Sequence, residues 1–126
     1  MGRLWLGVGL LIALLLIGVL IATAMDGIHG PLSEVLTQAS RAALSGDLEG
    51  GTILGRQARA DWEKHRYCTA AVADHTPMDE IDSLFAEMEV YAQAEDDAHF
   101  AACCAQLAQM VRAMGDAHIF SWWNLL

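Results

Sequence analysis

The sequence predicts an all-α protein, in which an N-terminal transmembrane helix is followed by a small antiparallel bundle of about four helices. Three observations predict this fold. A long uncharged run opens the chain, apolar residues recur at helical spacing through most of the remainder, and no useful stretch alternates with the two-residue period of a strand. We expect an anchor (1–25), a linker (26–30), a helical domain (31–118) and an apolar, aromatic C-terminal tail (119–126).

The predicted anchor depends on residues 4–25, which carry no charge and are mostly Leu, Ile, Val, Ala and Gly. As a helix this run would be about 33 Å long, enough to cross the ~30 Å hydrocarbon core of a bilayer. A cleaved signal peptide is an alternative, because Ala22-Thr23-Ala24 has the form of a cleavage site. The run is longer than a usual signal-peptide core, so we expect a retained anchor. A helix buried in a soluble core is the third alternative.

The charges that flank the anchor predict its orientation. Arg3 and the α-amino group precede it, Asp26 follows it, and the first basic residue beyond it is Arg41. Because basic residues favour the cytoplasmic side, we expect a single-pass protein of the cell membrane with a cytoplasmic N-terminus and an extracytoplasmic domain.

The domain that follows the anchor is strongly acidic. Residues 26–126 hold all 16 Asp and Glu but only six of the seven Lys and Arg, which leaves a net charge of −10. Such a surface repels nucleic acid, so nucleic-acid binding is excluded as a function. The charge indicates a solvated surface, with a cation- or peptide-binding face as the alternative.

The first two helices of the domain are predicted from their ends. The first runs from Pro31 to about Leu44, with Gly46 as the residue after its C-terminus and Asp47 as the N-cap of the next helix. Glycines at 50, 51 and 55 disfavour a helix, so the second helix is expected to begin near Thr52. Alternatively, these glycines allow a neighbouring backbone to approach closely.

Two further helices follow. Thr76 and Pro77 predict the start of the third, a break falls near residues 95–97, and Gly115 predicts the end of the fourth. We expect three of the largest apolar side chains to point into the core: Trp62, Phe85 and Leu107.

Candidate metal ligands occur in two helical pairs. His65 and Cys68 are three residues apart, and His99 and Cys103 are four apart, so either pair lies on one helix face. With His75 they could form a zinc site, but no C-x-x-C or H-E-x-x-H motif supports one. We therefore predict no cofactor.

The three cysteines do not indicate a disulfide framework or a catalytic site. Buried, unreactive thiols are expected, with a bridge from Cys68 to Cys103 or Cys104 as the alternative. A nucleophilic Cys68 would need an electropositive pocket, which an acidic domain does not favour. The sequence thus predicts no catalytic residue and no enzyme.

Candidate interface residues lie at both ends of the chain. The anchor contains two small-residue pairs on opposite helix faces, and six of the last eight residues are apolar. The tail could pack on the bundle, lie in the membrane interface or bind a partner. The predicted interface residues are Gly9, Ala13, Gly18, Ala22, Trp122, Trp123, Asn124, Leu125 and Leu126.

Several short motifs, in their order and spacing, resemble those of one family. They are Arg3-Leu4-Trp5, Ala42-Ala43, Gly46-Asp47, Trp62, His75, Asp79-Glu80-Ile81 and the closing Trp123-Asn124-Leu125-Leu126. The chain resembles an uncharacterised domain-of-unknown-function family of short, single-pass membrane-anchored helical proteins of clostridial Gram-positive bacteria. The resemblance implies a cell-membrane location and carries over no catalytic residue. The glycines between 46 and 55 depart from the continuous helix that it implies.

The expected function is that of a membrane-tethered, non-catalytic accessory or interaction protein. Its expected partners are the lipid bilayer and another membrane protein, and the oligomeric state is left open. One alternative is an extracytoplasmic ligand-sensing or binding domain that uses His75 and nearby acids. Another is a thiol or metal enzyme.

Overall fold

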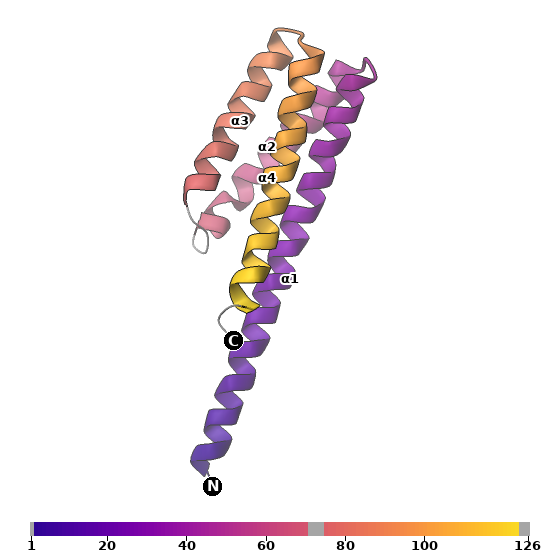
Figure 1. Cartoon of the computed structure of the whole chain (residues 1–126). Coiled ribbons are helices and arrows are strands. Elements are labelled where there is room, and N and C mark those ends of the chain that lie inside the picture. Colours follow the sequence, from indigo (N-terminus) through magenta and orange to yellow (C-terminus); the bar gives the residue numbers. More distant parts are fainter. Residues whose placement is uncertain (1, 71–74, 124–126) are drawn as a thin grey trace.

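Four helices make up the described part of the chain in the computed structural model (Figure 1): α1 (Gly2–Leu44), α2 (Leu48–Ala70), α3 (His75–Gln93) and α4 (Asp97–Trp123). The structure describes the backbone of residues 2–70 and 75–123, and the side chains of residues 2, 5–20, 23, 27, 29–66 and 76–116. No strand occurs within these ranges. The all-α prediction is therefore confirmed.

Helix α1 combines two predicted elements. It runs without a break through residues 26–30, where the sequence suggested a linker, and contains Pro31 in its interior. A proline inside a helix removes one backbone hydrogen bond, and the nearby glycines add a further cost. The helix nevertheless continues because this part is packed: His29, Leu32 and Ser33 are all buried. Tertiary contacts override the local preference.

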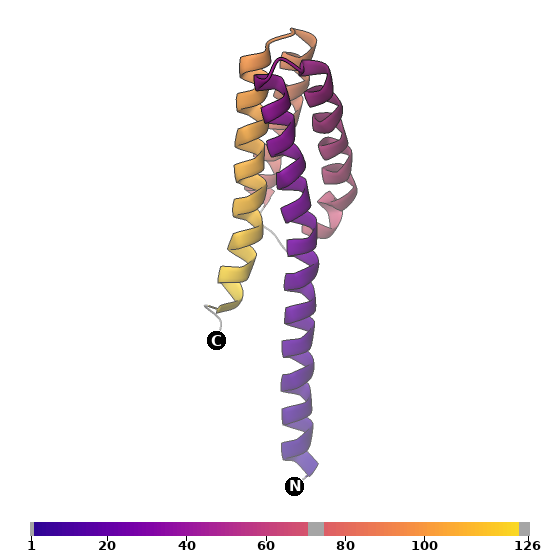
Figure 2. The same ribbon diagram turned by 90° about the vertical axis from the view of Figure 1, so that its right-hand side faces the viewer.

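The N-terminal part of α1 projects beyond the other three helices, with the N-terminus at its far end (Figures 1 and 2). Over the residues whose side chains are described, no helix has a stretch both long and apolar enough to cross a membrane. The structure thus does not support the transmembrane part of the predicted fold. The alternative of a helix buried in a soluble core is wrong for residues 5–20, because their large apolar side chains are exposed.

The turn between α1 and α2 has the predicted geometry. Gly46 adopts a φ of 92°, and the N–H groups of Gly46 and Asp47 donate to the carbonyls of Ala43 (3.1 Å) and Ala42 (2.9 Å). This pair of bonds closes the C-terminus of a helix in a Schellman motif. Asp47 then caps α2, because its Oδ1 accepts the N–H of Gly50 at 2.9 Å.

Helix α2 begins at Leu48, so the prediction of a start near Thr52 is wrong. The glycines within its first turns allow the close approach that was the alternative. A Cβ on Gly51 would lie 2.9 Å from the carbonyl oxygen of Ala39 in α1. A Cβ on Gly55 would lie 2.8 Å from the sulfur of Met88 in α3. Close packing therefore stabilises a segment whose local sequence disfavours a helix.

The turn between α3 and α4 repeats the geometry of the first turn with different residues. Glu95 takes the left-handed position with a φ of 55°, and the N–H of Asp96 donates to the carbonyl of Tyr91 at 3.0 Å. Asp96 caps α4 through the N–H of His99 at 3.2 Å. The predicted break near residues 95–97 is confirmed.

The core runs along the bundle axis and includes side chains from all four helices. Trp62, Phe85 and Leu107 are each at most 1% exposed, which confirms their predicted positions. Of the neighbouring helix pairs, α1 and α4 share the most extensive contact and α2 and α3 the least. The side of the bundle between α2 and α3 is therefore the more open one.

Helix α4 does not end at Gly115, as its sequence had suggested, but continues to Trp123. Gly115 is a packing position, since a Cβ there would lie 3.2 Å from the Cβ of His29 in α1. Part of the predicted tail, residues 119–123, is thus the end of a helix that runs along α1. Figures 1 and 2 both show this end of α4 beside α1, on the side from which the N-terminal part of α1 projects.

Candidate functional site

The predicted interface residues of α1 differ in their exposure to solvent. Gly9 and Ala13 are exposed, and nothing lies within 4 Å of the position that a Cβ on Gly9 would take. Gly18, on the opposite face, is buried. The side chain of Ala22 lies outside the described residues.

The predicted interface residues of the tail are only partly described. Trp122 and Trp123 form the last residues of α4, although their side chains lie outside the described part of the chain. Asn124, Leu125 and Leu126 lie outside it entirely. Their role in an interface stays a prediction.

His99 and Cys103, one of the two candidate metal-ligand pairs, bond to different groups and do not form a common metal site. The ring of His99 bonds the Asp96 carboxylate (Nδ1–Oδ2 2.7 Å) and stacks on Tyr91 with the ring centroids 5.2 Å apart. The Sγ of Cys103 instead donates to the carbonyl of Leu84 at 3.1 Å. No three His, Cys, Asp or Glu side chains in the described part of the chain gather as metal ligands would.

The other predicted metal ligands and thiols are described only in part. His65 Nδ1 lies 2.8 Å from the carbonyl oxygen of Asp61, one turn earlier in α2. The side chains of Cys68 and His75 lie outside the described residues. Cys103 and Cys104 are free cysteines, so the structure does not support the alternative of a bridge from either of them to Cys68.

Cys103 and Cys104 are buried thiols. Burial raises the pKa of Cys103 to about 11 and that of Cys104 to about 12, with a smaller contribution from Glu87 for the first and from Cys103 for the second. Both are therefore protonated at neutral pH. A thiol needs its thiolate form to act as a nucleophile, so neither cysteine is poised for that chemistry.

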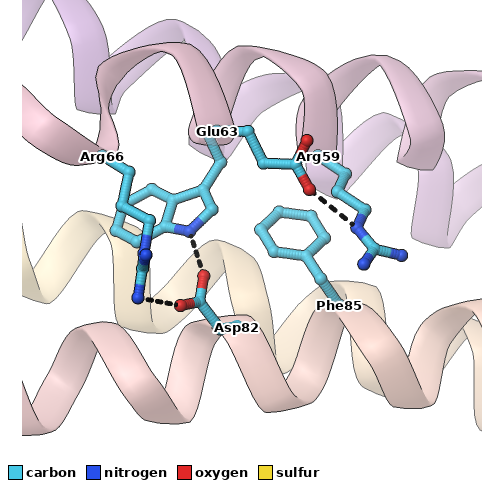
Figure 3. A pocket seen from close by; sticks show the side chains of 6 residues that line it. Arg59, Glu63, Arg66, Asp82 and Phe85 are labelled. Carbon is cyan, nitrogen blue, oxygen red and sulfur yellow. Dashed lines mark hydrogen bonds and ion pairs between the residues drawn. The ribbon is translucent and has the colours of Figure 1, made fainter.

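A groove of about 360 Å³ opens between α2 and α3, the pair of neighbouring helices with the least contact (Figure 3). Four charged side chains stand around it, and two aromatic side chains lie behind them, each 1% exposed. The lining residues are Arg59, Trp62, Glu63, Arg66, Asp82 and Phe85.

Asp82 holds one end of the groove together. Its Oδ1 accepts the indole N–H of Trp62 at 2.8 Å, and its Oδ2 lies 2.7 Å from Nη2 of Arg66. A buried indole needs an acceptor for its N–H, which this carboxylate supplies from the facing helix. One carboxylate thus fixes both a buried indole and a guanidinium.

A second ion pair joins the same two helices outside the groove. Arg56 and Glu89 form two parallel bonds, Nη2–Oε1 at 2.6 Å and Nε–Oε2 at 3.2 Å. The hydrogen bond from Arg56 lowers the pKa of Glu89, and the same bond raises the pKa of Arg56. Arg56 and Glu89 thus form a two-bond ion pair, with which the single bonds of Arg59 and Arg66 can be compared.

The sequence predicts Trp62 and Phe85 as core residues but assigns no role to the charged residues around them. The spacing of these charged residues in the sequence nevertheless indicated that they share helix faces. The arginines at 56, 59 and 66 follow helical spacing along α2, and the acids at 82 and 89 lie seven residues apart on α3. Only the pairing of these two helices brings Arg66 to Asp82 at the groove and Arg56 to Glu89 beside it.

Comparison of the chain with protein-family models, curated protein sequences and solved structures returns no match. The family resemblance drawn from the short motifs therefore stays a prediction.

Proposed function

We propose that the protein is a membrane-tethered, non-catalytic accessory or interaction protein whose N-terminal part of α1 lies in a lipid bilayer. A single observation carries this proposal: an unbroken apolar helix surface that the rest of the chain leaves exposed. Trp5 is 78% exposed and Leu20 is 71% exposed. The large apolar side chains exposed between them are Leu6, Val8, Leu10, Leu11, Ile12, Leu14, Leu15, Leu16, Ile17 and Val19.

A lipid environment suits this surface better than water does. Contiguous exposed apolar surface on a helix marks a membrane or protein interaction site. The uncharged run at residues 4–25 has the length that a bilayer core requires. Arg3 on one side and Asp26 on the other favour an N-terminus in the cytoplasm and a bundle outside the cell membrane.

The course of α4 supports a second contact with the membrane surface. Gly115 lies level with His29 of α1, and the two helices run antiparallel. Because both helices rise by about 1.5 Å per residue, Trp123 falls about level with residue 21 of α1. In the proposed arrangement the aromatic end of α4 lies about one helical turn inside the C-terminal end of the uncharged run, close to the membrane interface where Trp side chains are favoured.

Charge substitutions in the exposed apolar surface test the proposal. Replacing Leu11 and Leu15 together by Arg should release the protein from membranes, because each Arg near the centre of a span costs about 2.5–3.5 kcal/mol. The measurement is the fraction that stays in the membrane pellet after extraction with alkaline carbonate. Ile53→Arg is the matched control, since Ile53 is 61% exposed on the bundle and should leave attachment unchanged. Complete extraction of the wild-type chain would contradict the proposal.

The orientation is tested separately by adding protease to intact protoplasts. The bundle should be digested together with a known surface protein. Protection of the bundle under those conditions would reverse the proposed orientation without affecting the membrane attachment.

A second candidate function is a ligand-binding domain. The groove between α2 and α3 favours it, because charged groups that converge on one hollow are a feature of small-molecule sites. The sequence predicts such a site at His75 and nearby acids, whereas other residues line the groove.

A further inference from the structure

Two arginines outside α2 form no ion pair with any described side chain, because every arginine ion pair in that part of the chain uses a residue of α2. They are Arg41 of α1 and Arg112 of α4. Both are exposed, and both line a groove of about 400 Å³ between these two helices, the α1–α4 groove. Glu34 is the single acid among its lining residues, so this groove is locally cationic in a chain whose net charge is −9.

Between its two arginines the α1–α4 groove is lined with small side chains. They are Thr37 and Ser40 of α1, and Ala105 and Ala108 of α4. Thr37 is partly buried and Ala105 is exposed, so this lining is open to a neighbouring molecule. The distance between two packed helices depends on the side chains at their contact, and small ones allow the closest approach. The groove therefore suits a further helix.

The outer side of α3 carries the opposite charge. Glu80, Ser83, Glu87 and Val90 follow one another at intervals of three or four residues, which places them in one line along the helix, the α3 ridge. All four are exposed, Val90 to 62%. Neither glutamate forms an ion pair with a described side chain. The hollow beside the ridge, between α3 and α4, is lined by three acids and no cation.

The two arginines stand at different heights along the α1–α4 groove. The hydroxyl of Ser40 donates to the carbonyl of Ala101 at 2.8 Å, so Arg41 is about level with that residue of α4. Arg112 lies 11 residues further along α4, which is ~16 Å nearer the anchor at about 1.5 Å per residue. Side chains lean toward the N-terminus of their helix. In these antiparallel helices the upper arginine leans toward the anchor and the lower one toward the turns, which brings the two charges closer together.

The two glutamates of the α3 ridge match these heights. The Sγ of Cys103 donates to the carbonyl of Leu84 at 3.1 Å, which relates the levels of α4 and α3. Glu87, three residues beyond Leu84, therefore lies about level with the upper arginine. Glu80, four residues before Leu84, lies ~7 Å above the lower arginine, on the side toward which that arginine leans.

We propose that copies of this chain assemble side by side in the membrane, with the α3 ridge of one copy seated in the α1–α4 groove of the next. Glu87 then pairs with Arg41 of the neighbouring copy, and Glu80 pairs with Arg112. Because α1 and α3 run in the same direction (Figure 1), copies with a common orientation present the ridge and the groove in parallel. This inference names the partner for the proposed interaction role, and it rests on the proposed membrane attachment for the common orientation.

The contact is heterologous, because the ridge and the groove are different surfaces of the chain. Each copy that fills a neighbour's groove still offers its own groove, so the contact repeats until a ring closes. Glu34 lowers the attraction for a glutamate at the lower end of the groove. The pair of Glu87 with Arg41 therefore contributes the larger share.

The experiment measures association between two differently tagged full-length copies that are coexpressed and extracted from membranes in an uncharged detergent. Purification through one tag should recover the wild-type copy that carries the other tag. The groove reversal, Arg41→Glu with Arg112→Glu, and the ridge reversal, Glu80→Arg with Glu87→Arg, are the test variants. Each should reduce its own self-association about tenfold or more, because like charges then face each other.

Coexpression of the two reversed variants with each other gives the decisive result. The ridge of each variant then faces a groove of opposite charge on the other, so recovery should return to near the wild-type level. A defect in folding would not be rescued in this way. Glu49→Arg with Glu95→Arg is the matched control, because it makes the same change of charge at a separate hollow beside the two turns. It should alter recovery less than about twofold, since distant exposed charges are largely screened.

Four results would overturn the proposal: no recovery of the second wild-type copy, unchanged recovery in both reversed variants, no restoration when the two are combined, or an equal loss in the control. Association through the anchor alone would leave recovery unchanged in both reversed variants. If a double reversal loses its helical circular dichroism, the single reversals Arg41→Glu and Glu87→Arg decide in the same way, because both positions are exposed. Carbonate extraction of the same variants reports on membrane attachment, so failure of one proposal is distinguishable from failure of the other.

Discussion

The two helical hairpins, α1–α2 and α3–α4, reach the same turn geometry with different side chains. In each, an aspartate follows a left-handed residue and caps the next helix: Asp47 after Gly46, and Asp96 after Glu95. The backbone hydrogen bonds of the turn are also equivalent. The aspartate cap and these bonds, rather than a glycine, are the features that the two turns share.

The hairpins differ one turn further along, where they meet. Gly51 and Phe100 occupy the equivalent position, four residues after the capping aspartate, and each N–H bonds the carbonyl of that aspartate. A Cβ on Gly51 would lie 3.2 Å from a ring carbon of Phe100. The large side chain of the second hairpin thus fills the space that the first leaves empty, and the asymmetry lets two similar units pack together.

The largest expected loss of stability comes from removing the Phe100 side chain from this contact. Phe100→Ala should lower the free energy of unfolding by about 3–5 kcal/mol, because a fully buried ring is lost and a cavity is left. Chemical denaturation measures the change. Val90→Ala, at a position that is 62% exposed, should cost less than about 0.5 kcal/mol. Similar losses for the two variants would place Phe100 outside the core.

Substitutions on the glycine side of this contact should cost less stability, and the cost should differ between the glycines. Gly51→Ala should destabilise the chain by about 1–3 kcal/mol, because its Cβ meets the backbone carbonyl of Ala39, which cannot move freely. Gly55→Ala should cost less, since its Cβ meets the flexible end of Met88. Thermal melts of both variants test the order, and a more stable Gly51 variant would refute the close approach.

The two turns should respond in opposite directions to substitution at the left-handed position. Gly46→Ala should cost about 1 kcal/mol, and Glu95→Gly should stabilise the chain by up to about 1 kcal/mol, because only glycine adopts a positive φ without strain. Denaturation midpoints of the pair give the comparison. A destabilised Glu95→Gly chain would mean that the carboxylate makes a contribution that outweighs its strain.

The smallest expected effect is the loss at low pH of the stability that Asp96 contributes as the cap of α4. The backbone N–H of His99, followed by its side chain, lowers the pKa of Asp96 below its usual 3.8. A carboxylate whose pKa is lowered in the folded state adds stability above its unfolded pKa, and that stability is lost as the pH falls through the folded value. The stability difference between wild type and Asp96→Asn should therefore be present at pH 7 and vanish near pH 2. A difference that persists in acid would exclude the charge as its source.

The candidate site was less accessible to prediction than the fold. Local patterns indicated Asp47 as a cap and Phe85 as a core residue, because capping and helical periodicity act within a few residues. The groove depends on which helix lies beside α2. Arg66 meets Asp82 across 16 positions of sequence, and nothing in the helical pattern of either segment specifies that pairing.

The sequence by itself determined the helical class, both turns and the inward faces of the helices, since each follows from interactions between near neighbours in the chain. The tertiary structure decided where helices continue against their local preference. Residues 26–30 stay helical because His29 packs on α4, Gly51 because α1 approaches it, and Gly115 because it receives the side chain of His29. At each of these positions, contact with a distant segment outweighs a local cost of about 1 kcal/mol per glycine, and only the packed bundle supplies that contact.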